Sequence, residues 1–153
     1  QGPGWLASPK WSKPTVILLS LWTVGQQVVT YLAALQDVPQ ALYDAAEVDG
    51  ANALQKIRHV TLPMITPVIF FNLIISTIGA FQYFTVSYVI TQGDGRPAQS
   101  LLFYAMYLYN KAFVEYRMGL ASAQAWMLFL IVLVATLILF RTSGWVYYSG
   151  ERS

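Results

Sequence analysis

Residues 43–51, Tyr-Asp-Ala-Ala-Glu-Val-Asp-Gly-Ala, form a short polar insert between two long uncharged stretches of the chain. These uncharged stretches cover residues 16–35 and 61–92. Charged side chains are costly inside the hydrocarbon of a bilayer, so charges that stand between two apolar segments are expected outside it. The insert therefore predicts a solvent-side loop, with structure of its own, between two membrane spans.

Three windows of the sequence satisfy the length rule for a spanning helix, which is about 20 apolar residues. We place the spans at 16–35, 63–90 and 118–140. The predicted fold is all-α: a polytopic membrane helical bundle with three spans, whose chain ends lie on opposite sides of the membrane. Pro67 and Gly79 predict a tilt or a kink in the second span.

The composition supports a membrane protein and excludes several other classes. The 153 residues are 56% hydrophobic and only 10% charged, whereas an ordinary soluble domain is roughly 25% charged. A formal net charge of +2 does not indicate the strongly basic surface that nucleic-acid binding requires. Cysteine is absent and His59 is the single histidine, so a zinc site has too few ligands. We predict no metal site and no cofactor.

The polar insert predicts two short helices around a turn. The first covers 40–48, where alanines give strong helix propensity. Gly50 is expected to close it in the left-handed conformation. Asp49 or Asn52 is expected to cap a second helix over 53–59.

The spacing of this segment resembles the cytoplasmic coupling loop of permease subunits in ATP-binding-cassette importers. The motif of that family runs Glu-Ala-Ala, three residues, Gly, nine residues and Ile-x-Leu-Pro. Here Ala46 is followed by three residues and Gly50, and then by residues 51–59 and Val60-Thr61-Leu62-Pro63, without a gap. Asp44 stands where the family usually has Glu, and Val60 where it usually has Ile. We expect Leu62-Pro63 to redirect the chain into the membrane.

The resemblance implies a role for the loop and a set of partners. It implies that the loop docks on a cytoplasmic ATPase dimer and that a rigid turn at Gly50 transmits the motion of this dimer to the spans. The residues that it assigns to ATPase coupling are Asp44, Ala45, Ala46, Glu47, Asp49, Gly50, Ala51, Leu62 and Pro63. A second permease subunit and an extracytoplasmic solute-binding protein are also implied, in a bacterial or archaeal cell (inner) membrane.

The same resemblance assigns the sides of the membrane. Residues 36–62 form the cytoplasmic coupling loop and 141–153 a cytoplasmic tail. Residues 1–15 form an extracytoplasmic loop, and 91–117 another that contains a short interfacial helix. The basic residues give no help, since four would lie inside and five outside. Aromatic residues near the span ends suit an interfacial belt: Trp5, Trp11, Tyr147 and Tyr148.

The resemblance covers nearly the whole chain, and it is to the sugar-importing branch of these permeases. The matching segments are 32–35 with Val38-Pro39, 70–72, Phe81-Gln82, 117–123 and 145–148. The outer turn, Thr91 to Pro97, is longer than in the branch. Subunits of the family are considerably longer than this chain, which opens without an initiator Met or a leader-like segment, so we expect it to be the C-terminal part of one, beginning inside a loop.

Polar and aromatic side chains inside the spans are candidates for a solute path. We assign Trp22, Gln82 and Tyr83 to it, because amides and aromatic faces suit carbohydrate chemistry. For Gln26, Asn72 and Gln124 we favour hydrogen bonds between helices. No charge lies within a span, which disfavours an ion or proton relay.

Two alternatives remain beside the importer. The first is a pore or secondary carrier subunit for a small neutral solute, in which the insert is a mere connector. The second is a membrane anchor without a solute path. A phosphate-binding loop is absent from the sequence, so the chain is not expected to be an enzyme; ATP hydrolysis is expected in a partner subunit.

Overall fold

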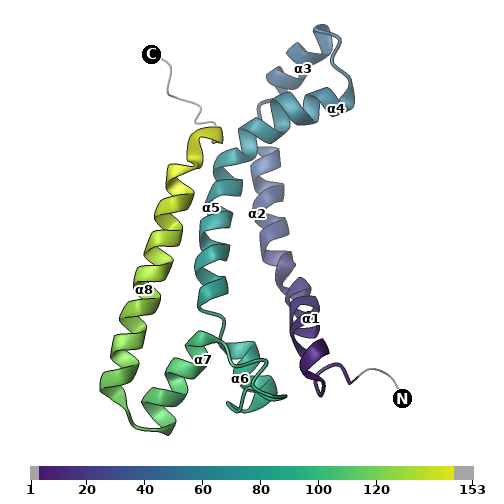
Figure 1. Ribbon diagram of the computed structural model, residues 1–153. Coiled ribbons are helices and arrows are strands. Elements are labelled where there is room, and N and C mark those ends of the chain that lie inside the picture. Colours follow the sequence, from purple (N-terminus) through teal and green to yellow (C-terminus); the bar gives the residue numbers. More distant parts are fainter. Residues whose placement is uncertain (1–3, 147–153) are drawn as a thin grey trace. The chain divides into compact units, whose positions relative to one another are not determined.

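The computed structural model describes residues 4–146, and its regular structure in that range is entirely helical (Figure 1). The chain divides into two compact units. The first takes its described residues from 4–24 and 76–137, and the second from 25–75 and 138–146. The predicted all-α class is confirmed.

The helices follow one another along the chain with short interruptions. In the first unit are α1 (Pro9–Ser20), a 3₁₀ turn (Leu21–Val24), α6 (Thr85–Thr91), α7 (Tyr104–Tyr109) and a π-helical turn (Asn110–Val114). In the second unit are α2 (Gly25–Gln36), α3 (Gln40–Val48), α4 (Ala53–Lys56), a π-helical turn (Ile57–Thr61) and a 3₁₀ turn (Ser143–Trp145). The long helices α5 (Leu62–Phe81) and α8 (Met118–Arg141) each contribute residues to both units.

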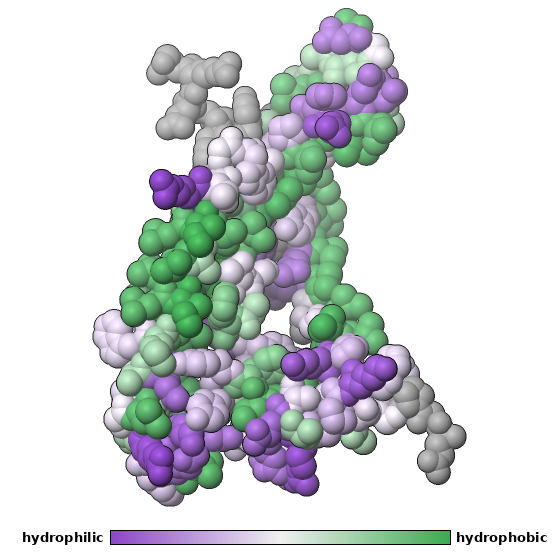
Figure 2. All heavy atoms as spheres, in the orientation of Figure 1, coloured by the Kyte–Doolittle hydropathy of each residue, from purple (hydrophilic) through white to green (hydrophobic). Residues whose placement is uncertain are grey.

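Three helical stretches are long and apolar enough to cross a membrane: Pro9–Gln36, Ala53–Thr91 and Met118–Trp145. Their side chains are mostly exposed; Val29, for example, keeps 67% of its surface and Val89 keeps 70%. Figure 2 shows apolar side chains covering the visible face of α8. Exposed apolar helices of this length match the hydrocarbon thickness of a bilayer, so the surface is that of a membrane protein.

The first helix begins earlier than the sequence indicates. The prediction of a loop through Thr15 is wrong for residues 9–15, which are helical. Pro9 occupies the first helical turn, where a missing amide costs nothing. Pro14 lies inside α1 and removes one backbone hydrogen bond, but the helix continues through it.

The second predicted span is not one helix. Helix α5 continues through Pro67 and past Gly79, ends at Phe81, and is separated from α6 by three non-helical residues, 82–84. The first predicted span is interrupted in a similar way by the 3₁₀ turn at 21–24. The interruption after Phe81 is accompanied by contacts of Tyr83 and Ser87 with residues in the segment 101–106. A pattern of apolar residues does not reveal such contacts.

A small core holds the 85–106 region of the first unit together. Ser87, Leu101 and Met106 are fully buried, and the Ser87 hydroxyl donates to the Leu101 carbonyl. Gly95 has φ +66°, and a Cβ there would lie 2.7 Å from the Leu102 Cβ. Only glycine fits this approach, so the long outer turn has a defined structure. The short helix expected within 91–117 is present as α7.

Candidate functional site

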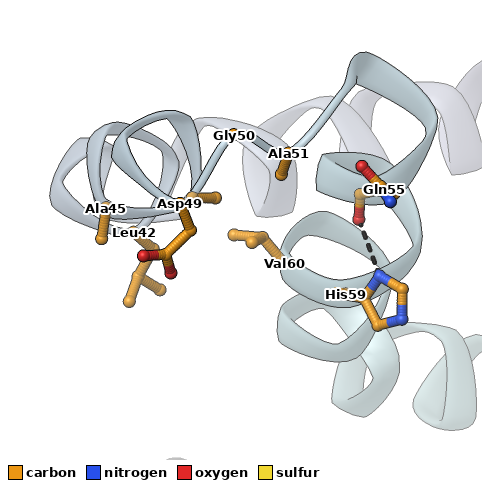
Figure 3. Close-up of a pocket in the computed structure, with 9 residues that line it drawn as sticks. Leu42, Ala45, Asp49, Gly50, Ala51, Gln55, His59 and Val60 are labelled. Atoms are coloured by element: carbon orange, nitrogen blue, oxygen red, sulfur yellow. Dashed lines mark hydrogen bonds between the residues drawn. The ribbon is translucent and has the colours of Figure 1, made fainter.

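The polar insert forms a helical hairpin, α3 followed by α4, within the second unit (Figure 3). The turn after α3 is closed by Gly50 at φ +75°. The Gly50 amide donates to the Glu47 carbonyl at 3.0 Å and the Ala51 amide to the Ala46 carbonyl at 2.9 Å. This pair of hydrogen bonds is a Schellman motif, which satisfies helix carbonyls that would otherwise lack donors. The predicted left-handed Gly50 is confirmed.

Helix α4 begins with a capping box. The Asn52 side chain accepts from the Gln55 amide at 2.9 Å, and the Gln55 side chain accepts from the Asn52 amide at 2.8 Å. The sequence left Asp49 and Asn52 open as the cap of the second helix. The structure assigns that role to Asn52, while Asp49 ends α3.

We expect Asn52→Ala to destabilise the start of α4 by about 1 kcal/mol, since it removes one half of the reciprocal cap. Hydrogen exchange of the Gln55 amide in the full chain should accelerate by roughly fivefold, in line with that free energy. Asn52→Asp retains a capping oxygen and should exchange close to the wild-type rate. Equal protection in the alanine variant would contradict this role.

Two side-chain contacts tie α3 to α4 and to the π-helical turn that follows it. Lys56 Nζ lies 2.8 Å from Glu47 Oε2, and the Tyr43 hydroxyl lies 2.8 Å from Thr61 Oγ1. The hydrogen bond from Lys56, and then its charge, lower the pKa of Glu47 below the ordinary 4.5. The ion pair therefore contributes at pH values above 4.5 and is lost as the pH falls through the lowered pKa. Glu47 is exposed, so screening by solvent keeps this contribution small.

An open groove of about 480 Å³ lies along the hairpin. Its lining residues are Leu42, Ala45, Ala46, Asp49, Gly50, Ala51, Gln55, His59 and Val60. Figure 3 shows Leu42, Ala45 and Asp49 on one arm and Gln55, His59 and Val60 on the other. The His59 ring nitrogen Nδ1 lies 3.1 Å from the Gln55 carbonyl. Small alanines beside a carboxylate make a surface that another protein can approach closely.

The groove contains five of the nine residues predicted for ATPase coupling: Ala45, Ala46, Asp49, Gly50 and Ala51. Of the others, Asp44 accepts a hydrogen bond from Gln40 at 3.3 Å and Glu47 pairs with Lys56. Sequence reasoning did not assign Leu42, Gln55, His59 and Val60 to this site. The i, i+4 spacing of Gln55 and His59, which places them on one helix face, is the signal that points to that pair.

The remaining two predicted coupling residues, Leu62 and Pro63, lie in the first turn of α5. The helix does not end at these residues, because the stretch that begins at Ala53 is helical up to the break after Phe81. That Leu62-Pro63 redirects the chain into the membrane stays a prediction. The π-helical turn at 57–61 carries the helix past the proline, with the Leu62 amide donating to the Ile57 carbonyl. Such a widened turn accommodates a residue without an amide. The second arm of the hairpin is therefore joined directly to a membrane-spanning helix.

The three predicted solute-path residues all lie at helix interruptions of the first unit. Trp22 is in the 3₁₀ turn and 92% exposed. Gln82 and Tyr83 are in the break between α5 and α6, where the Tyr83 ring lies 5.1 Å from the Phe103 ring. At membrane depth, non-helical backbone is tolerated only inside protein or beside a water-filled cavity.

Of the other amides, Asn72 differs from the prediction. Asn72 donates to the Val68 carbonyl of its own helix at 2.9 Å, so the expected bond between helices is wrong there. Gln124 has a buried Oε1 for which residues 4–146 supply no hydrogen-bond partner. In that same part of the chain, no group of three His, Asp or Glu side chains comes together that could hold a metal ion. Tyr147, Tyr148 and Arg152 lie outside the described residues.

The fold and this site define a class: a polytopic helical membrane protein with a structured polar hairpin inserted between two spans. The chain belongs to the family of binding-protein-dependent transport system inner membrane components, whose sequence profile matches residues 3–148. The localisation expected from the sequence, the inner membrane, agrees with the family.

Curated relatives show the same relationship. The chain is 45% identical to a probable ABC transporter permease protein, YesP, of Bacillus subtilis (strain 168), over 96% of this chain and 48% of YesP. It is 41% identical to the lactose transport system permease protein LacF of Rhizobium radiobacter, over 72% of this chain and 37% of LacF. It is 39% identical to the arabinooligosaccharides transport system permease protein AraP of Bacillus subtilis (strain 168), over 89% of this chain and 43% of AraP.

A solved structure also matches. It is the bacterial alginate ABC transporter in complex with an alginate pentasaccharide-bound periplasmic protein, with a TM-score of 0.81 and 27% identity. The match covers 94% of this chain and 50% of that chain. The chain thus spans about half the length, or less, of these curated relatives.

Proposed function

We propose that the chain is part of a permease subunit of an ATP-driven importer, that it contributes to the translocation path of a sugar or related polyol, and that it couples to a separate ATPase through residues 43–63. The single observation that carries this proposal is the hairpin, which is closed by the Schellman motif at Gly50 and continued by helix into α5. The family and the names of the relatives, which include lactose and arabinooligosaccharide permeases, support the solute class.

The proposed coupling is mechanical. The ATPase dimer grips the hairpin along the groove, with Asp44 and Asp49 as acceptors for basic side chains of the ATPase. Closure of the dimer around ATP displaces the hairpin, and α4 transmits the displacement because α4, the π-helical turn and α5 follow one another without a non-helical residue. On this proposal 36–62 and 141–153 are cytoplasmic, while 1–15 and 91–117 are extracytoplasmic. A second permease subunit and a solute-binding protein complete the transporter.

The proposed solute path passes the helix interruptions at 21–24 and 82–84. An exposed indole at Trp22 offers a flat apolar face for a sugar ring, and the Gln82 amide offers both a donor and an acceptor for hydroxyl groups. Broken helices are a recurring way for transporters to place polar backbone groups at a solute site. The interruptions at 21–24 and 82–84 therefore support a solute path through this region.

One crosslinking experiment distinguishes the importer from a pore, a secondary carrier or a membrane anchor. The chain contains no cysteine, so Ala46→Cys introduces a single thiol into it, inside the groove. In the purified full transporter, a short bifunctional maleimide should link this position to the ATPase, and ATP should change the yield. Arg96→Cys, in the outer turn, is the matched control and should give no such product. A pore, a secondary carrier or an anchor predicts no ATPase crosslink from either position.

A further inference from the structure

A second concave site is built from residues of the first unit, which does not include the hairpin. It has a volume of about 420 Å³, within the roughly 300–1,000 Å³ typical of small-molecule sites. Its lining comes from α6, the segment 92–102, α7 and the π-helical turn after α7 with Glu115. None of the residues predicted from the sequence for coupling or for the solute path lines it.

The backbone at this site is arranged to bring polar groups together. Gly93 has φ +90°, and a Cβ there would lie 3.2 Å from Tyr88 Cε2 and 3.7 Å from Asn110 Oδ1. Asn110 Nδ2 donates to the Gly93 carbonyl at 2.8 Å, which leaves the amide oxygen of Asn110 as an acceptor. Glycine therefore permits a tyrosine ring and an amide to approach the same turn.

The lining also carries an ion pair. Lys111 Nζ lies 2.6 Å from Glu115 Oε1 and 5.1 Å from the centre of the Tyr107 ring. The Lys111 side chain is largely buried, with 17% of its surface exposed. Because Lys111 is already paired with Glu115 and lies near the Tyr107 ring, a ligand that binds these side chains pays little ordering entropy.

The chemistry of the lining indicates a carbohydrate. Side-chain amides of Gln92, Gln99 and Asn110 line the site together with the tyrosines Tyr88 and Tyr107. An amide offers paired donors and an acceptor that match adjacent hydroxyl groups, and a tyrosine ring offers an apolar face to the C–H face of a sugar ring. The charges of Lys111 and Glu115 can each bind a hydroxyl group.

We propose that this site binds a sugar unit, separately from the path at Trp22, Gln82 and Tyr83. The ligand class rests on the proposed function, but the site does not need the ATPase. With 91–117 extracytoplasmic, the site would hold a sugar on the outer side of the membrane. A loop of a protein partner is the competing occupant, and labelling in the presence of sugars or of the sugar-free solute-binding protein distinguishes the two.

Alkylation of one introduced thiol tests the proposal. Gln99→Cys places a thiol in the lining at an exposed position. The native glutamine already has φ +57° there, so the variant replaces one residue with a Cβ by another. In the purified full transporter, a mixture of xylotriose, arabinotriose, maltotriose and cellotriose at millimolar concentration should slow maleimide labelling at least fivefold. Mass spectrometry of the peptide that contains residue 99 measures the rate. Glycine betaine at the same osmolarity should leave the rate unchanged.

Two matched variants make the result specific. Arg96→Cys lies outside the lining and should label at the same rate with and without the sugars. Tyr107→Leu in the Gln99→Cys background removes the aromatic face while retaining bulk, so protection should disappear although the rate without sugar persists. A changed labelling rate without sugar would show that Tyr107→Leu had deformed the pocket. Gln92→Ala, which changes a lining residue outside the helices, would then replace Tyr107→Leu as the test variant.

Each outcome decides the proposal. No protection by the mixture overturns it, and so does protection by the sugar-free solute-binding protein alone, which would assign the site to a protein loop. Protection that persists in both lining variants also overturns it. If sugars protect residue 99 while Ala46→Cys gives no ATPase crosslink, the site stands and the proposed coupling fails; the reverse result removes the site alone.

Discussion

Gly50→Val should reduce transport-coupled ATP hydrolysis by roughly tenfold, which corresponds to ~1.4 kcal/mol, while the protein still inserts into the membrane. Gly50 has φ +75° and no heavy atom within 4 Å of the position of an added Cβ. The expected loss therefore comes from backbone strain, which is about 1–2 kcal/mol for a residue with a Cβ in the left-handed region. Relief of this strain would open the Schellman motif and turn the groove away from its partner.

The measurement is sugar-stimulated ATPase activity of the reconstituted transporter, with the amount of inserted permease determined by immunoblot. Gly50→Asn is the matched control, since asparagine tolerates the left-handed conformation, and it should retain most of the activity. Unchanged sugar uptake in the valine variant would remove the proposed role of the turn.

Trp22→Ala should lower sugar uptake by roughly tenfold, or ~1.4 kcal/mol in binding or transition-state free energy, with unchanged basal ATP hydrolysis. The indole is 92% exposed on the 3₁₀ turn of the first unit, so its removal leaves no cavity in this chain. The effect is therefore expected on the solute and not on folding. Uptake is measured with the sugar that most raises the thermal stability of the solute-binding protein.

Trp22→Phe should recover most of the uptake, because it retains an aromatic face for stacking. Val29→Ala, at another exposed apolar position, controls for a general effect of shortening a membrane-facing side chain. Wild-type uptake in Trp22→Ala would remove this residue from the path. A loss of inserted protein equal to the loss of uptake would assign Trp22 to packing against a neighbouring subunit.

The proposed solute path and the proposed coupling role of the hairpin make different demands on local structure. The hairpin depends on tight caps, since Gly50 and Asn52 satisfy backbone groups at the two helix ends that meet there. The proposed path depends on breaks in the helices, since Gln82 and Tyr83 lie where α5 has ended. A substitution of Gly50 or Asn52 should therefore affect ATPase coupling more than solute selectivity. A substitution of Gln82 or Tyr83 should affect solute selectivity more than coupling.

The residues by themselves determined the helical class, the number of apolar stretches and the closure of α3. Long uncharged runs have only one low-energy backbone in a bilayer, because a helix satisfies every amide and carbonyl internally. Gly50 was predictable for a similar reason: its left-handed conformation closes the helix through neighbours within five residues along the chain.

Tertiary structure decided the features that depend on residues far apart in the sequence. The break after Phe81 is accompanied by the contact of Tyr83 with Phe103 and the bond from Ser87 to Leu101, and no local pattern encodes such partners. The continuous helix through Pro63 required a π-helical turn, whose widened hydrogen bonding is not a property of any single residue. The polar pocket beside Tyr88 likewise arises because the outer turn returns to α7, so its lining is assembled by folding and is invisible in the order of the residues.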